Sequence, residues 1–121
     1  MAKILIADDS LMMRKVARMS LEKGGHSVIE AEDGAQALAL AKTELPNLIL
    51  LDAEMPELDG FEASKALKAD PVTANIPVLI CTGHDLSGEP EMLKNAGAIG
   101  SITKPYNPAQ LLEKVSEVLN G

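Results

Sequence analysis

The sequence predicts an α/β fold, with a doubly wound five-stranded parallel sheet and helices on both faces. Two observations predict it: five short apolar runs alternate with five amphipathic segments, and the length of 121 residues suits one domain, residues 1–121. Because strand–helix–strand crossovers are right-handed, this alternation places helices on both faces of one open sheet. With five strands, the order 2-1-3-4-5 is favoured over the other common doubly wound order.

The expected strands are short apolar runs, most of them rich in Ile, Leu or Val and flanked by Gly, Pro, Asn or Asp, as buried parallel strands are. They are Lys3–Ala7, Ser27–Ala31, Leu48–Leu51, Val78–Cys81 and Ile99–Thr103. The single cysteine, Cys81, ends one of these runs and is expected to be a small core residue.

Helices are expected in the other segments, three of which end at stop signals: Gly24-Gly25, Pro46 and Asp70-Pro71. The expected helices are Leu11–Lys23, Gly34–Leu45, Gly60–Ala69, Glu89–Ala96 and a last one with Asn107 as N-cap and Pro108 at its first position. The residues expected to share one side are Val16, Met19 and Ser20 in the first helix, Leu38, Ala41 and Leu45 in the second, and Leu111, Leu112, Val115, Val118 and Leu119 in the last.

The composition excludes several classes of function. A net charge of −7 argues against a nucleic-acid partner, because phosphate contacts need clustered Lys and Arg, and two aromatic residues cannot form a base-stacking surface. One cysteine excludes a disulfide framework and a four-thiolate zinc site. No apolar run approaches the roughly 20 residues of a membrane span, and the N-terminus lacks a secretory signal. We therefore expect a soluble, acidic, cytoplasmic protein with no membrane partner.

Polar residues follow the expected strands at the points where they end. Asp8 and Asp9 follow the first strand, Asp52 the third, Thr82 the fourth and Lys104 the fifth. In an open α/β sheet, ligands bind outside the carboxyl ends of the strands, where the strand order reverses. The topology therefore gathers the three aspartates at this switch point, with Thr82 and Lys104 beside them.

Three clustered carboxylates require either protonation or a cation, since a pair about 5 Å apart repels by roughly 3 kcal/mol at an effective dielectric constant near 20. An all-oxygen set with few protein donors favours Mg²⁺, or Mn²⁺. Lys104 would neutralise a bound anion. A carboxylate nucleophile, a divalent metal, a lysine and a hydroxyl are the parts needed for phosphoryl transfer.

Four stretches that surround these residues occur in order along the chain. They are Ile4–Ser10 (ILIADDS), Glu30–Gly34 (EAEDG), Leu50–Gly60 (LLDAEMPELDG) and Thr103–Tyr106 (TKPY), with Thr82 in place before the last. Together, at this spacing, they are specific, and the chain resembles a CheY-like receiver domain of bacterial two-component response regulators, of the stand-alone type. The resemblance implies a flavodoxin-like fold and a signalling switch that performs no catalysis beyond phosphoryl transfer and dephosphorylation on itself.

The resemblance also implies a role for each residue at the metal site. Asp9 would bind Mg²⁺ directly and Asp8 through water. Asp52 and the backbone carbonyl of Glu54 would be further ligands. The same resemblance implies that Glu54 and His84 flank the site and set the lifetime of the phosphoryl group.

The phosphoryl group itself is expected on Asp52. The resemblance implies a histidine kinase or phosphotransfer protein as donor, Lys104 paired with the phosphoryl oxygens, and Thr82 hydrogen-bonded to the group. It further implies a cis peptide bond between Lys104 and Pro105.

The response is expected at a surface formed by the fourth helix, the fifth strand and the fifth helix, including Met92, Ser101, Tyr106 and Leu112. A downstream protein in chemotaxis, motility or a phosphorelay would bind there. Receivers usually carry an aromatic residue three positions before the lysine, where this chain has Ser101, so the change is expected to travel by shifts of a loop and the fourth helix. We expect a monomer, with dimerisation possible on phosphorylation.

Simpler structural roles are also open for several of these residues. Asp8 or Asp9 could cap a helix, Thr82 could be a turn residue, and Glu30 is expected to lie on a solvated edge with its acidic neighbours. Competing functions are a receiver fragment of a larger regulator or hybrid kinase, an unphosphorylated interaction module, and an aspartate-based phosphatase. The phosphatase reading lacks the Asp-x-Asp pattern after the first strand, and a flavodoxin-like cofactor binder lacks a glycine- and hydroxyl-rich loop there.

Overall fold

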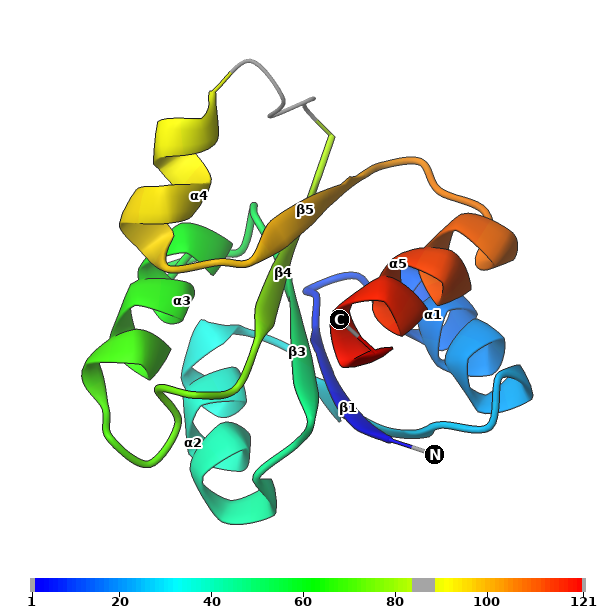
Figure 1. The fold of residues 1–121 in the computed structure, drawn as a ribbon, viewed down its shortest axis with the longest axis horizontal. Helices are drawn as coiled ribbons and strands as arrows, with labels where there is room; N and C mark the ends of the chain where they lie inside the picture. The colour runs from blue at the N-terminus through cyan, green and yellow to red at the C-terminus, as the bar shows by residue number, and fades with distance from the viewer. Residues whose placement is uncertain (1, 84–88, 121) are drawn as a thin grey trace.

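The computed structural model describes residues 2–83 and 89–120, and it contains the predicted five-stranded parallel sheet (Figure 1). The strands are β1 (Lys3–Ala7), β2 (Ser27–Ala31), β3 (Leu48–Asp52), β4 (Val78–Thr82) and β5 (Gly100–Thr103). Their order in the sheet is β2-β1-β3-β4-β5, which confirms the order predicted from the number of strands.

Five helices connect and follow the strands. They are α1 (Leu11–Lys23), α2 (Gly34–Glu44), α3 (Gly60–Ala69), α4 (Pro90–Ala96) and α5 (Pro108–Asn120). Side-chain oxygens cap four of their N-termini: Ser10 accepts from the backbone of α1, Asp33 from that of α2 and Asp59 from that of α3. At α5, Oδ1 of Asn107 accepts from the N–H of Gln110 at 2.8 Å, which confirms the predicted N-cap. In the part of the chain that the structure describes, no helix is long and apolar enough to cross a membrane.

The sheet is the middle of three layers, with α1 and α5 on one face and α2, α3 and α4 on the other (Figure 1). Successive residues of a strand point to opposite faces, so each strand serves two cores. Leu5, Ile49 and Ile80 belong to the core beneath α2 and α3. Ile6, Leu50 and Leu79 belong to the core beneath α1 and α5. Every residue of β3 and β4 is buried, as expected of central parallel strands.

The predicted element boundaries differ from the structure by one residue at five ends. β3 and β4 each gain a residue, because Asp52 and Thr82 still pair with Cys81 and Thr103 of the neighbouring strands. Three elements are one residue shorter than predicted: α2 ends at Glu44, α4 begins at Pro90, and β5 begins at Gly100. The site aspartate of β3 is therefore held within the sheet instead of in the loop that follows.

The predicted sides of α1 and α2 coincide only in part with the sides that face the sheet. In α1, Val16, Met19 and Ser20 share one side, as predicted, and line one cavity with Leu112 of α5. Val16 and Met19 are nevertheless 44% and 60% exposed, and Ala17 and Leu21 face the sheet. In α2, Ala41 is buried as predicted and Leu38 packs against the core, but Leu45 is 55% exposed. Leu45 lies past the end of the helix in the left-handed conformation (φ 46°), so it does not continue the helical stripe. Ala17 of α1 and Ala37 and Ala41 of α2 are buried, so small residues form much of the face that these helices turn to the sheet.

The predicted stripe of α5 is correct. Leu111 and Val115 are fully buried, while Leu112, Val118 and Leu119 pack at its edges. Cys81 is a core residue, as predicted, and burial raises the pKa of its thiol to about 12. The thiol therefore stays protonated at neutral pH.

Candidate functional site

Three carboxylates converge at the carboxyl end of the sheet. Asp8 and Asp9 follow β1, and Asp52 is the last residue of the adjacent strand β3. One carboxylate oxygen from each lies within 4.8 Å of the others. The three residues line a cavity of about 360 Å³, together with Ser10, Met13, Glu54, Gly83 and Lys104. The structure thus brings together the predicted acidic residues, Lys104 and Glu54.

Lys104 joins two of the three carboxylates. Its Nζ donates to Oδ1 of Asp52 at 3.0 Å and to Oδ2 of Asp8 at 3.3 Å. The lysine comes directly after the edge strand β5, so the ion pairs bridge from the edge of the sheet to its centre. The Lys104–Pro105 peptide bond is cis, which confirms the prediction made from the resemblance.

The three carboxylates differ in their exposure to solvent. Asp8 and Asp52 are buried, whereas Asp9 is exposed. Burial raises the pKa of Asp52 above its ordinary value, the negative charge of Asp8 adds to the rise, and Lys104 offsets only part of it. For Lys104, burial alone lowers the pKa, but its hydrogen bond to Asp52 and the charges of both aspartates raise the pKa above its ordinary value overall. Lys104 is therefore fully charged at neutral pH.

The donor set fits a hard divalent cation. When ionised, the three aspartates carry three negative charges, and Lys104 supplies one positive charge. The remaining charge of −2 matches that of one dication, and carboxylate oxygens are the ligands that Mg²⁺ and Mn²⁺ prefer. Asp9, the exposed member, lies where an incoming ion meets it from solvent.

Backbone groups hold the two buried carboxylates in place. The N–H of Ser10 donates to Oδ1 of Asp8 at 2.9 Å, and the N–H of Glu54 donates to Oδ1 of Asp52 at 3.3 Å. Behind Asp52, the N–H of Gly60 donates to the carbonyl of Ala53 at 3.1 Å. A Cβ at Gly60 would overlap the carbonyl oxygen of Asp52, so only glycine lets the first turn of α3 pack so closely.

Thr82 lies beside the acidic cavity and does not line it. It is buried at the end of β4 and lines a second cavity of about 320 Å³, which reaches Phe61 of α3 and Met92 of α4. Glu54 lines both cavities, so it forms the wall between them. His84, the other residue expected to flank the site, lies outside the described residues, as does Gly88 before α4.

The prediction that Glu30 lies on a solvated edge is wrong. Its side chain is 14% exposed and accepts hydrogen bonds from three cations of α1: Arg14, Lys15 and Arg18. The hydrogen bond from Arg18 lowers the pKa of Glu30 most, and Lys15 and Arg14 lower it further, to about 2 against the penalty of burial. The basic residues Arg14, Lys15 and Arg18 at helical spacing in α1 were a signal for an acidic partner, but the sequence does not show that this partner is Glu30 of β2.

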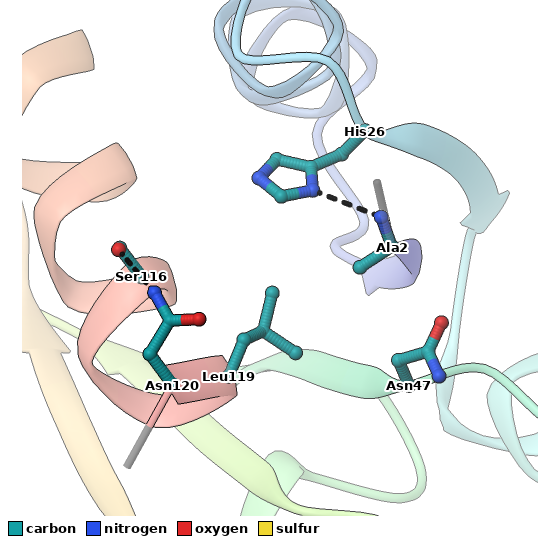
Figure 2. A pocket seen from close by; sticks show the side chains of 6 residues that line it. All are labelled: Ala2, His26, Asn47, Ser116, Leu119 and Asn120. Atoms are coloured by element: carbon teal, nitrogen blue, oxygen red, sulfur yellow. Dashed lines mark hydrogen bonds between the residues drawn. The ribbon is translucent and has the colours of Figure 1, made fainter.

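A separate cavity lies at the opposite end of the sheet. It has a volume of about 310 Å³ and its lining includes Ala2 and Asn47, which precede β1 and β3 (Figure 2). There Nδ1 of His26 accepts from the N–H of Ala2 at 3.2 Å, and Nδ2 of Asn120 donates to the hydroxyl of Ser116 at 2.9 Å (Figure 2). No member of the acidic cluster lines it. The acidic cavity is therefore the candidate site.

Comparison with known proteins agrees with the fold and the acidic cluster. A family model described as the response regulator receiver domain matches residues 4–116. The chain therefore belongs to the response regulator receiver domain family, whose members are switches of two-component signalling.

Individual relatives extend this assignment along the chain. Over 122 aligned residues the sequence is 43% identical to protein PilH of Pseudomonas aeruginosa, with 100% of both chains covered. The chemotaxis response regulator CheY4 of Vibrio cholerae superimposes with a TM-score of 0.93 and 35% identity, covering 98% of this chain and 99% of that one. The receiver domain of the sensor histidine kinase PA1611 of Pseudomonas aeruginosa gives a TM-score of 0.89 and 27% identity, covering 99% and 98%, and holds a magnesium ion in its active-site cleft.

Proposed function

We propose that residues 1–121 act as a phosphorylation switch, in which Asp52 accepts a phosphoryl group from a phosphohistidine on a histidine kinase or phosphotransfer protein. The observation that carries this proposal is the environment of Asp52: a buried carboxylate, bound by Lys104 at 3.0 Å, opens into a cavity that two further aspartates line. Such a site combines a nucleophile with groups that neutralise the charge of a phosphoryl group.

Mg²⁺, or Mn²⁺, is the proposed metal. Asp9, Asp52 and the backbone carbonyl of Glu54 would hold it directly, and Asp8 would do so through water. When bound, the ion supplies positive charge to the carboxylates and the phosphoryl oxygens. The magnesium in the PA1611 receiver domain, which is similar in fold, supports this assignment.

The chain's own residues position and neutralise the transferred group. An oxygen of Asp52 forms the new P–O bond as the P–N bond to the donor histidine breaks, and the histidine nitrogen keeps the electron pair. Lys104, already held over this carboxylate, pairs with the phosphoryl oxygens. The hydroxyl of Thr82, buried at the end of the next strand, turns toward them and alters the second cavity, which reaches α4.

The output surface of this switch is the face formed by α4, β5 and α5, where a downstream protein of a chemotaxis, motility or phosphorelay system binds. A cavity of about 210 Å³ opens on this face, and its lining includes Ser101 of β5, Tyr106, and Gln110 of α5. It lies beside the position where receivers usually carry an aromatic side chain. The protein acts in the cytoplasm, as a monomer before phosphorylation.

Asp52→Asn tests the proposal. The purified chain is incubated with acetyl phosphate, with and without Mg²⁺, and covalent modification is followed by intact mass spectrometry. We expect one added phosphoryl group on the wild type, only when Mg²⁺ is present, and none on Asp52→Asn. Asp33→Asn is the matched control, because asparagine caps a helix as well as aspartate does and Asp33 lies at the start of α2. Equal modification of Asp52→Asn, or labelling independent of Mg²⁺, would refute the proposal.

A further inference from the structure

A buried arginine lies beneath the loop that carries two of the aspartates. Arg14 of α1 is 6% exposed, and its Nη1 donates to the backbone carbonyl of Asp8 at 2.6 Å. A charged donor at this distance makes a strong hydrogen bond. This contact is to the main chain, so it acts on the path of the loop and leaves the Asp8 carboxylate free to meet Lys104.

The carbonyl that Arg14 binds belongs to the peptide group joining Asp8 to Asp9. On the other side of Asp8, its N–H donates to the carbonyl of Ala31 in β2 at 3.2 Å. β1 ends at Ala7 and α1 begins at Leu11, so the Asp8 carbonyl lies between two regular elements. Because a peptide group is planar, fixing this carbonyl also fixes the amide of Asp9 and the direction in which the chain leaves Asp8.

A second contact holds the guanidinium in place. Nε of Arg14 donates to Oε1 of Glu30 at 3.1 Å, and Glu30 stands beside Ile6 in the strand register. The other oxygen of Glu30 accepts from Lys15 and Arg18 on the exposed side. Glu30 therefore anchors Arg14 to the sheet, while the two exposed cations balance the rest of its charge.

We propose that Arg14 is a positioning residue for the metal site: it orients the Asp8–Asp9 peptide group so that the Asp9 carboxylate is presented to the divalent cation. This role rests on the proposed function. Arg14 acts through the backbone of the loop and touches neither the ion nor the phosphoryl group. Lysine cannot replace it, because one ammonium cannot bind the Asp8 carbonyl and Glu30 in the same planar geometry.

The first measurement uses the metal-free protein and does not depend on the proposed function. The amide nitrogen of Asp9 shares its peptide group with the carbonyl that Arg14 binds, so its ¹⁵N chemical shift reports on that hydrogen bond. We expect this shift to change in Arg14→Gln and Arg14→Lys. We expect it to stay unchanged in Arg18→Gln, which loses a contact with Glu30 but leaves Arg14 in place.

The second measurement is Mg²⁺ affinity by isothermal titration calorimetry on the same proteins. We expect the Kd to rise about tenfold in Arg14→Gln, the scale seen when groups that orient metal ligands are removed. We expect the Kd of Arg14→Lys to lie between those of Arg14→Gln and the wild type, and the Kd of Arg18→Gln to equal that of the wild type. Arg14→Lys, which keeps a cation and a donor, decides the question if Arg14→Gln does not fold.

Loss of stability is separated from loss of positioning by Glu30→Gln. This variant loses the ion pairs of Glu30 with Arg14, Lys15 and Arg18 but keeps an oxygen that accepts from Arg14. We therefore expect a lower free energy of unfolding with a Kd within about twofold of the wild type. A tenfold rise in Kd for Glu30→Gln or Arg18→Gln, or an unchanged Kd in the folded Arg14 variants, would overturn the inference. Failure of the proposed function has a different signature: the wild type itself binds no Mg²⁺, or Asp9→Asn binds it equally well.

Discussion

Lys104 partly neutralises the charge of two buried carboxylates, Asp8 and Asp52. It therefore competes with a bound metal ion for these carboxylates. Its ammonium lies within 3.3 Å of oxygens from both Asp8 and Asp52. A divalent cation at the proposed site draws on the same two carboxylates. Positive charges that share ligands repel each other, so the lysine that we propose assists phosphoryl transfer should also weaken metal binding.

Replacing this lysine therefore separates two properties. In Lys104→Met we expect Mg²⁺ to bind several-fold more tightly, equivalent to about 1 kcal/mol of relieved repulsion, while phosphorylation of Asp52 becomes slower. Calorimetry measures the first effect and the rate of labelling by acetyl phosphate the second. Lys114→Met on α5, outside the acidic cavity, should change neither. Weaker Mg²⁺ binding in Lys104→Met would show that the ammonium organises the carboxylates more than it competes for them.

At the scale of elements, the start of α3 packs against the main chain of β3 behind the site. Asp59 and Glu62 form a reciprocal cap, in which the N–H of Glu62 donates to Asp59 at 2.8 Å and the N–H of Asp59 donates to Glu62 at 3.2 Å. Gly60 lies between them and backs directly onto the main chain at Asp52. The helix and the strand that carries the proposed phosphoacceptor are thus packed without intervening side chains.

We expect Gly60→Ala to destabilise the fold by about 1–3 kcal/mol, since the added methyl group meets main-chain atoms that cannot rotate away. Denaturant unfolding measures this change. Gly83→Ala is the control, because a Cβ there meets no atom within 4 Å among the described residues and its φ is not in the left-handed range. If Gly60→Ala unfolds at the wild-type midpoint, the contact between α3 and β3 is looser than the structure shows.

The ion pairs between β2 and α1 give the protein an acid-sensitive component of stability. The hydrogen bond from Arg18 contributes most to lowering the pKa of Glu30 from 4.5 to about 2. A group with a lowered folded-state pKa stabilises the fold above its unfolded-state value, and this contribution is lost as the pH falls toward the folded-state value. The window here runs from near 4.5 down to about 2.

Glu30→Gln removes this component. We expect it to lower the free energy of unfolding by about 1–2 kcal/mol at neutral pH, a value reduced for the exposure of Lys15 and Arg18. The difference from wild type should shrink as the pH falls through the window, because the wild-type carboxylate becomes protonated. Urea unfolding across this range measures it, with Glu113→Gln on the exposed side of α5 as control. A difference independent of pH would mean that packing, and not charge, accounts for the role of Glu30.

At the scale of the whole molecule, the acidic cluster exists only when the chain is folded. Asp9 and Asp52 are far apart in sequence and meet because β1 and β3 are neighbours in the sheet. A ligand that binds only the folded state raises the free energy of unfolding. At a Mg²⁺ concentration ten times the Kd, we expect a gain of about 1.4 kcal/mol, measured as a rise in Tm and reversed by a chelator. Asp9→Asn should show no such gain, and equal stabilisation of this variant would place the ion elsewhere.

Much of this architecture could be predicted because local patterns in the sequence determine it. The apolar runs of β3 and β4 are buried along their whole length, and the stop signals at Gly24, Pro46 and Pro71 delimit three helices. The aspartates could be placed together because the carboxyl ends of parallel strands share one edge of the sheet.

The remaining features depend on packing between distant segments. Val16 and Met19 are apolar at helical spacing, and nothing local shows that the smaller Ala17 faces the sheet instead. Glu30 looked solvated because its partners lie on a preceding helix and meet it only after β2 docks beside β1. Thr82 directly follows the predicted strand, but the cavity that it lines is also formed by α3 and α4, whose positions the sequence does not specify.

The contacts described above connect Glu30 to Arg14, Arg14 to Asp8, and Asp8 through Lys104 to Asp52. They run from β2, at one margin of the sheet, to the residue that follows β5 at the other. Substitutions at opposite margins of a sheet ordinarily have additive energetic effects. Because these contacts link the two margins, we expect the change in the free energy of unfolding on substituting Glu30 and Lys104 together to differ from the sum of the separate changes.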